Sequence, residues 1–262
     1  MMALEAHLRE RRDAGRKLLV PYVTGGLGDA WGETIEALAQ AGADAIEVGV
    51  PFSDPVMDGP VIQQASAEAL AAGATPDTVF DRVAQLDLDV PLVTMQYYNT
   101  VFRAGHERYA ARLRGAGISG AIVPDLPFLE SGPWRAAAVA EGLDTVLFGT
   151  PLTDDDELDE LVEAASGFVY GVGLLGVTGE RATLSETATE VAARLKSVTD
   201  RPVLIGIGVS TPEQASEVAS VADGVIVGTA VVRRMLEGAG PDGVASFVAD
   251  LRAALDDVAP AA

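Results

Sequence analysis

Glu47 and Asp58 are the residues of this sequence best suited to proton transfer. Glu47 lies inside the apolar run AIEVGV, which begins at Ala45 and offers no nearby Lys or Arg. An ionised carboxylate is costly to desolvate there, so we expect a raised pKa; the alternative is a buried Glu47 paired with a neighbouring cation. Asp58 follows in the proline-containing loop PFSDPVMDGP, either as a second carboxylate beside Glu47 or as an ordinary turn residue. The pattern predicts acid–base chemistry near neutral pH.

Glycine clusters follow three consecutive apolar runs and indicate a phosphate site, with ordinary turns as the alternative. They are Gly176–Gly179, Gly206–Gly208 and Gly228–Thr229, and a short helix is predicted to begin at Thr229. Backbone N–H groups at glycines and at a helix N-terminus bind anions without a cationic side chain. The segment Gly176–Leu184 lacks apolar periodicity, which predicts either a mobile lid or a plain connection.

The composition excludes several classes of function. The chain has 262 residues, and 18 Lys and Arg against 39 Asp and Glu give a net charge of −21, which opposes nucleic-acid binding. There is no cysteine, so disulfides, thiolate catalysis, zinc–cysteine sites and iron–sulfur clusters are excluded. Two histidines, His7 and His106, are too few for a three-histidine metal site. We interpret the acidity as a solubility feature.

The first residues carry no targeting signal that the sequence reveals. Met1–Lys17 mixes arginines with acidic residues and lacks the apolar core of a signal peptide. No apolar run approaches the ~18 residues that span a bilayer. We therefore expect a cytoplasmic protein.

Short apolar runs alternate with segments of helical period throughout the chain. Runs that are apolar on both faces are typical of a covered parallel sheet. The predicted strands begin at Leu18, Ala45, Pro91, Ala121, Thr145, Phe168, Val203 and Gly224. The predicted helices are Leu4–Asp13, Trp31–Ala41, Gln63–Ala72, Thr78–Leu86, Glu107–Ala116, Ser131–Ala140, Asp155–Ala165, Ser185–Val198, Pro212–Val221 and Gly243–Leu255.

Eight strand–helix units predict an α/β protein with a single (β/α)8 TIM barrel over residues 1–262, an extra N-terminal helix and a short phosphate-binding helix after the eighth strand. A doubly wound open sheet is the structural alternative. In such a barrel the active site lies at the carboxyl ends of the strands. Besides the two carboxylates, the polar residues placed there are Tyr97, Asn99, Asp125 and Tyr170.

Ordered motifs over nearly the whole chain resemble the α subunit of tryptophan synthase. The block GADAIEVGVPFSDPVMDGPVIQ at Gly42–Gln63 is the most specific of them. The others are PYVTGG at Pro21–Gly26, Tyr97-x-Asn99, PDLP at Pro124–Pro127, GVTG at Gly176–Gly179 and GTAVV at Gly228–Val232. The resemblance implies a barrel that cleaves indole-3-glycerol phosphate to indole and glyceraldehyde 3-phosphate, a carbon–carbon lyase without metal or organic cofactor.

The resemblance also implies roles for individual residues. Glu47 matches the general acid/base that protonates the indole C3 carbon and assists cleavage at the glycerol hydroxyl. Asp58 matches the carboxylate that stabilises the indole N–H. The positions matched to substrate binding are Tyr22 and Met95 at the indole ring, Tyr170 beside the glycerol phosphate, Thr178 in the lid, and Gly179, Gly208, Gly228 and Thr229 in the phosphate cradle.

This sequence departs from the family pattern at a few of these positions. Thr229 stands where many members have Ser, and Tyr22 stands where many have Phe. The sequence of the predicted lid region is GLLGVTG, beginning at Gly173 and Leu174. Many relatives carry Ser and Arg before GVTG.

A partner is implied as well, because the family works as an α2β2 heterotetramer and passes indole to a β subunit. The candidate contacts are Pro51–Gly59, Tyr98–Arg103 and Asp125–Glu130, with the apolar side chains of Val56, Met57, Phe102 and Phe128. Three alternatives stay open: a stand-alone lyase that releases free indole, a non-catalytic activator of a β subunit, and another phosphate-handling barrel such as a sugar-phosphate isomerase.

Overall fold

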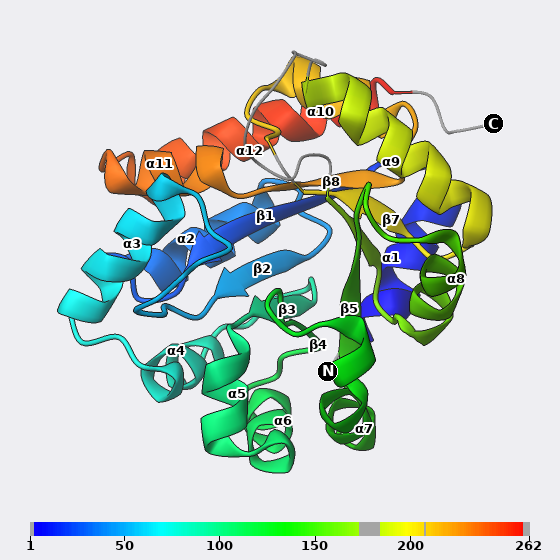
Figure 1. Cartoon of the computed structure of the whole chain (residues 1–262). Coiled ribbons are helices and arrows are strands. Elements are labelled where there is room, and N and C mark those ends of the chain that lie inside the picture. Colours follow the sequence, from blue (N-terminus) through cyan, green and yellow to red (C-terminus); the bar gives the residue numbers. More distant parts are fainter. Residues whose placement is uncertain (1–2, 173–183, 207, 259–262) are drawn as a thin grey trace.

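Eight parallel strands close into a barrel in which each strand pairs with the next and β8 pairs with β1 (Figure 1). The computed structural model describes residues 3–172, 184–206 and 208–258. The strands are β1 (Leu18–Thr24), β2 (Ile46–Gly49), β3 (Leu92–Met95), β4 (Gly120–Ile122), β5 (Asp144–Gly149), β6 (Val169–Gly171), β7 (Val203–Ile205) and β8 (Gly224–Val227). The predicted TIM barrel is confirmed, and the open-sheet alternative is excluded because the sheet closes.

Helices surround the barrel at the positions that the helical period predicts. They are α1 (Leu4–Asp13), α2 (Trp31–Gln40), α3 (Pro60–Ala71), α4 (Pro76–Val83), α5 (Tyr98–Ala104), α6 (His106–Gly115), α7 (Gly132–Ala140), α8 (Asp155–Ala164), α9 (Leu184–Val198), α10 (Pro212–Ala219), α11 (Thr229–Leu236) and α12 (Gly240–Asp256). Helix α5 and a 3₁₀ turn at Phe128–Glu130 were not predicted. Both lie in loops at the carboxyl ends of strands.

Local sequence signals set where several helices begin and end. The Thr75 side chain accepts a hydrogen bond from the N–H of Thr78 and caps α4, and Thr211 caps α10 in the same way. After α2 the chain turns at Gly42, whose φ of 100° is a conformation that glycine adopts without strain. These caps fix where the chain leaves each helix and enters the next strand.

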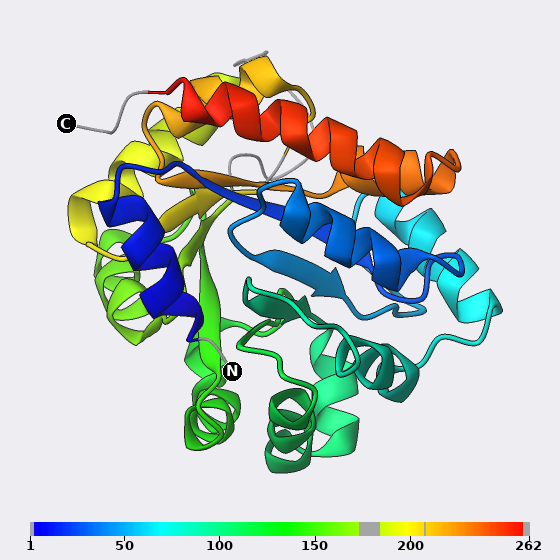
Figure 2. The same ribbon diagram turned by 180° about the vertical axis from the view of Figure 1, so that it is seen from behind.

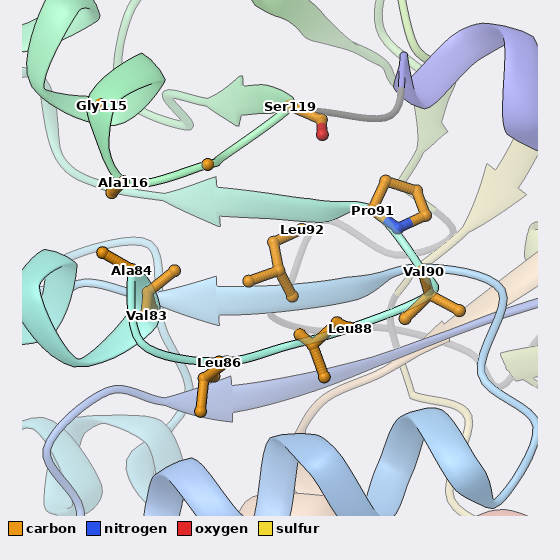
Figure 3. A pocket seen from close by; sticks show the side chains of 11 residues that line it. Val83, Ala84, Leu86, Leu88, Val90, Pro91, Leu92, Gly115, Ala116 and Ser119 are labelled. Atoms are coloured by element: carbon orange, nitrogen blue, oxygen red, sulfur yellow. The ribbon is translucent and has the colours of Figure 1, made fainter.

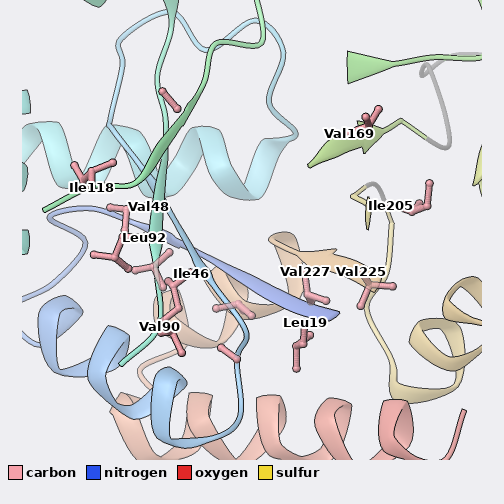
Figure 4. Close-up of a cluster of buried hydrophobic side chains, with 14 of the residues drawn as sticks. Leu19, Ile46, Val48, Val90, Leu92, Ile118, Val169, Ile205, Val225 and Val227 are labelled. Carbon is pink, nitrogen blue, oxygen red and sulfur yellow. The ribbon is translucent and has the colours of Figure 1, made fainter. Parts of the chain in front are cut away.

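Two apolar cores lie on opposite faces of the barrel wall. Outward-facing side chains such as Leu19, Ile46 and Val48 pack against the surrounding helices (Figure 4). Inward-facing side chains such as Val20 and Val93 fill the barrel interior. Successive side chains of a strand point to opposite faces, and here both faces are covered by an apolar core. Odd and even positions of each strand must therefore both be apolar, which is why the sequence shows no alternation of polar and apolar residues.

Helix α1 closes the amino end of the barrel. Its Leu4 and Leu8 side chains are fully buried in the interior core. The backbone N–H of Glu5 donates to Asp144 Oδ2 at 3.0 Å, and the Glu5 carboxylate accepts from the N–H of Gly167 at 3.2 Å. The loops that follow the strands form the opposite, carboxyl end of the barrel.

On the outside of the barrel, α12 and α2 lie side by side and cover β1 (Figure 2). None of the helices that the structure describes is long and apolar enough to span a bilayer.

Candidate active site

Glu47 lies on the inner face of β2, where its backbone registers with Tyr22 on β1 and Val93 on β3. The side chain is 1% exposed, and its Oε2 atom has no hydrogen-bond partner among the described residues. Burial, followed by the charge of Asp58, raises the pKa of Glu47 to about 8. No lysine or arginine in the described part of the chain forms an ion pair with it. Glu47 therefore keeps its proton at neutral pH and is able to give it up and take it back.

Asp58 lies in the loop between β2 and α3 and faces the same space as Glu47. Burial raises its pKa to about 6, against the opposing effect of a hydrogen bond from Tyr97. Asp58 is therefore mostly ionised at neutral pH, whereas Glu47 is mostly protonated. By contrast, Asp54 in the same loop is exposed and accepts a hydrogen bond from the hydroxyl of neighbouring Ser53, as an ordinary turn residue does.

Tyr97 anchors the Asp58 loop to the rest of the barrel. Its hydroxyl donates to Asp58 Oδ2 at 2.9 Å and accepts from the backbone N–H of Met57 at 3.0 Å. The ring of Phe52 stacks on it with centroids 5.0 Å apart. Sequence reasoning placed Tyr97 at the carboxyl end of β3 but did not assign it to the site, because nothing local in the sequence pairs it with Asp58.

Two tyrosines cross the barrel mouth above the interior core. Tyr22 packs against Ile62 and Ala65 of α3 and Val232 of α11. Tyr170 on β6 packs on Phe148, with ring centroids 4.9 Å apart, and its hydroxyl donates to the Gly206 carbonyl at 3.4 Å. Each tyrosine hydroxyl lies over a glycine. A Cβ on Gly49, at the end of β2, would lie 1.8 Å from the Tyr22 hydroxyl. A Cβ on Gly206, just after β7, would lie 2.0 Å from the Tyr170 hydroxyl.

Met95 joins two groups of apolar side chains at the end of β3. It packs against both the interior core and the cluster that contains Tyr22. That cluster includes residues of α3 and α11, which lie side by side next to β1 in Figure 1. Aromatic and aliphatic side chains therefore gather at the carboxyl ends of β1 and β3.

Three of the residues expected to bind an anion, Gly208, Gly228 and Thr229, follow β7 and β8 at the carboxyl end of the barrel. Gly208 has a φ of 90°, and Gly228 precedes Thr229, the exposed first residue of α11. The first N–H groups of a helix lack intrahelical acceptors, so α11 presents them at this end of the barrel. Thr178, Gly179 and residues 176–183 of the predicted lid lie outside the described residues, and Leu184 is the first residue of α9. No cluster of metal-ligating side chains occurs in the part of the chain that the structure describes.

A separate cavity of about 260 Å³ lies at the opposite end of the barrel wall (Figure 3). It is lined by apolar side chains such as Leu86, Leu88 and Leu92 and by the turn at Gly117. Because it lies at the amino ends of β3 and β4, it is not part of the carboxylate site.

Fold and site together define a TIM-barrel enzyme with a protonated and an ionised carboxylate at the carboxyl end of the barrel. The family model for the tryptophan synthase alpha chain matches residues 8–257. The chain belongs to this family, and it is thereby an enzyme subunit of tryptophan biosynthesis.

Individual relatives and solved structures agree with this assignment. The tryptophan synthase alpha chain of Streptomyces coelicolor is 43% identical over 252 residues, 93% of both chains. That of Halobacterium salinarum is 46% identical over 239 residues, covering 88% of this chain and 86% of the relative. The crystal structure of tryptophan synthase subunit alpha from Legionella pneumophila has a TM-score of 0.90 at 29% identity, covering 98% of this chain and 100% of that one. These matches favour none of the alternative functions.

Proposed function

We propose that this chain cleaves indole-3-glycerol phosphate to indole and glyceraldehyde 3-phosphate. The observation that carries the proposal is the opposite protonation of two neighbouring carboxylates, buried Glu47 with a pKa of about 8 and half-buried Asp58 with a pKa of about 6. Protonation of an indole carbon needs a carboxylic acid that still holds its proton at neutral pH. The developing positive charge on the ring nitrogen needs a carboxylate that is already ionised.

The reaction then proceeds by two proton movements. Glu47 gives its proton to C3 of the indole ring, and Asp58 accepts the ring N–H while positive charge develops there. Glu47, now ionised, removes the proton of the glycerol hydroxyl next to the bond that breaks. The electrons of that carbon–carbon bond return to the ring, so indole and the aldehyde leave and Glu47 regains its proton. Met95 and Tyr22 hold the ring, and Tyr170 lies beside the glycerol phosphate.

The phosphate is held by backbone groups after β7 and β8, at Gly208, Gly228 and Thr229. Thr178 and Gly179, which the family resemblance adds to the phosphate site, lie outside the described residues. Neutral dipoles suit this strongly acidic chain, because they bind an anion without adding a cation next to Glu47. A charged Lys or Arg at that place would lower the pKa on which proton donation depends.

A β subunit is the proposed partner, in an α2β2 assembly that receives the indole. The supporting feature is a group of exposed apolar side chains on loops at the carboxyl end of the barrel: Val56, Met57, Phe102, Leu129 and Leu152, each 58–79% exposed. Exposed apolar groups at one end of a molecule mark an interaction surface. Phe128, expected among them, instead packs partly buried against the core, with the Arg135 guanidinium 5.3 Å from its ring centroid.

Incubation of the purified chain with indole-3-glycerol phosphate, alone and with a β subunit, tests both proposals. We expect indole release by the wild-type chain, stimulation by the β subunit, and a loss of about 10²–10⁴-fold in Glu47→Gln. Glu217→Gln on the exposed face of α10 is the matched control and keeps full activity. Full activity of Glu47→Gln refutes the proposed role of Glu47, and an absence of stimulation refutes the partner.

A further inference from the structure

The ionised form of Glu47 needs a hydrogen-bond donor that the resting site does not supply. Its Oε2 atom is buried and unpartnered among the described residues. In the proposed reaction Glu47 must carry a negative charge after it protonates the ring, and an unpaired buried carboxylate is strongly disfavoured. A donor within reach would stabilise that charged state without preventing Glu47 from acting as an acid.

Tyr22 is placed to be that donor. Its backbone registers with Glu47 on the neighbouring strand, so both side chains point into the barrel next to each other. Its hydroxyl lies over Gly49, which is two residues beyond Glu47 and on the same face of β2. The ring therefore leans from β1 toward the end of β2, and only a glycine at position 49 leaves room for the hydroxyl. The phenol is close enough to Glu47 for the charge of that carboxylate to raise the pKa of Tyr22.

The other polar groups near Glu47 either donate their hydrogen bonds to other acceptors or are negatively charged, so they do not donate to the Glu47 carboxylate. Asp58, from the loop after β2, is an acceptor when it is ionised. The Tyr170 hydroxyl, from β6, donates to the Gly206 carbonyl. Tyr97 donates to Asp58. No cation of the described residues forms an ion pair at this place. The Tyr22 phenol stays protonated at working pH because burial, Asp58 and Glu47 all raise its pKa.

Thr24 leaves the phenol proton of Tyr22 free for Glu47. It lies two residues beyond Tyr22 on the same strand and is fully buried. It opposes the rise of the phenol pKa, which is the effect of a hydroxyl that donates to the phenol oxygen. The phenol proton is therefore not used by Thr24.

We propose that Tyr22 is a positioning residue for Glu47 and that its phenol donates a hydrogen bond to the Glu47 carboxylate when that carboxylate is ionised. The consequence for the reaction rests on the proposed function, because it concerns the step in which Glu47 acts as a base. The hydrogen bond forms in the free protein whenever Glu47 is ionised, so it can be tested without substrate.

The test is a titration of the Glu47 carboxyl carbon by ¹³C NMR in the full chain, with Glu47→Gln identifying its signal. In Tyr22→Phe we expect the pKa of Glu47 to rise by about one unit, since a lost donor to a carboxylate corresponds to one to two units. Gly49→Ala displaces the hydroxyl without removing it, and we expect a rise in the same direction. The alkaline limb of kcat/KM, where Glu47 loses its proton, should shift upward by the same amount.

Two variants separate this proposal from a general effect of altering the core. Tyr109→Phe removes a buried, unpartnered hydroxyl on α6, outside the barrel mouth, and should leave the titration unchanged. Thr24→Val keeps the phenol proton of Tyr22 and should raise the pKa of Glu47 by less than Tyr22→Phe does. An unchanged or lowered pKa in Tyr22→Phe overturns the proposal, as does an equal rise in Tyr109→Phe. A failure to cleave indole-3-glycerol phosphate contradicts the proposed function alone, because the titration uses no substrate.

Discussion

The hydroxyl of Tyr97 donates a 2.9 Å hydrogen bond to Oδ2 of Asp58 and thereby connects the segment after β3 to the loop after β2. This single contact sets the charge of one catalytic candidate, because a donor to a carboxylate lowers its pKa against the rise that burial causes. It also fixes the position of that loop beside Glu47.

Removal of this donor should weaken the site at acid pH. In Tyr97→Phe the pKa of Asp58 rises from about 6, so Asp58 is neutral over a wider range and no longer balances charge on the ring nitrogen. We expect kcat/KM to fall about tenfold near pH 6 and to recover in part as the pH rises. Tyr98→Phe is the matched control, since the Tyr98 hydroxyl bonds to His106 Nε2 at 3.0 Å instead. Identical pH profiles for wild type and Tyr97→Phe would contradict this role.

Glu47 should make the folded state less stable as the pH rises. Its pKa increases from 4.5 in the unfolded chain to about 8 in the folded one, so the folded state binds the extra proton between these values. Stability from this group is fully present below pH 4.5 and is lost as the pH rises through 8, by on the order of a few kcal/mol. Urea unfolding at pH 5 and pH 8.5 measures the loss.

Glu47→Gln should remove most of that difference, because glutamine does not titrate. The exposed Glu217→Gln should keep it. Asp58 contributes a smaller loss of the same sign to every one of these proteins, so it cancels in the comparison. The expectation is wrong if wild type and Glu47→Gln lose the same free energy of unfolding between the two pH values.

A methyl group on Gly206 should displace Tyr170. The added Cβ would lie 2.0 Å from the tyrosine hydroxyl, so the ring must move off the substrate position. A misplacement of about 1 Å is expected to lower kcat/KM by about 10²-fold in Gly206→Ala. The second substitution Tyr170→Leu should restore part of the loss by making room. Gly132→Ala meets no neighbouring atom and should change nothing, and a fully active Gly206→Ala would argue against the close contact.

Salt should stabilise this chain strongly. Its net charge of −21 produces self-repulsion, and screening shortens from about 10 Å at 0.1 M to about 3 Å at 1 M ionic strength. We expect the urea midpoint to rise between 0.1 M and 1 M KCl. The triple variant Asp156→Lys, Asp159→Lys and Glu160→Lys on the exposed face of α8 lowers the repulsion and should show a smaller rise. A midpoint that falls with KCl would refute this account.

The barrel could be predicted from the sequence because its signal is local and repeated. Each strand is a short apolar run, and each predicted helix has its own caps, as Thr75 and Gly42 show. Helix α5 was missed because YNTVFRA is short and rich in aromatic and β-branched residues, and its end depends on Gly105 with a φ of 87°.

The candidate site was predictable only in part. Glu47 stands out because a carboxylate inside an apolar run has no local explanation. The placement of Asp58 beside it depends on the path of a loop, and its contact with Tyr97 joins residues 39 apart in the chain. The close approach of Tyr22 to Gly49 depends on the register between β1 and β2, and sequence spacing does not encode that register.

The helix that closes the amino end has a consequence for the order of assembly. Residues Leu4–Asp13 leave the ribosome early, but the groups that hold them, Asp144 and Gly167, belong to the second half of the chain. Until that half is synthesised, Leu4 and Leu8 have no interior to enter. A nascent chain that stops after β4 therefore exposes this apolar stripe, and it should be the form most readily captured by chaperones.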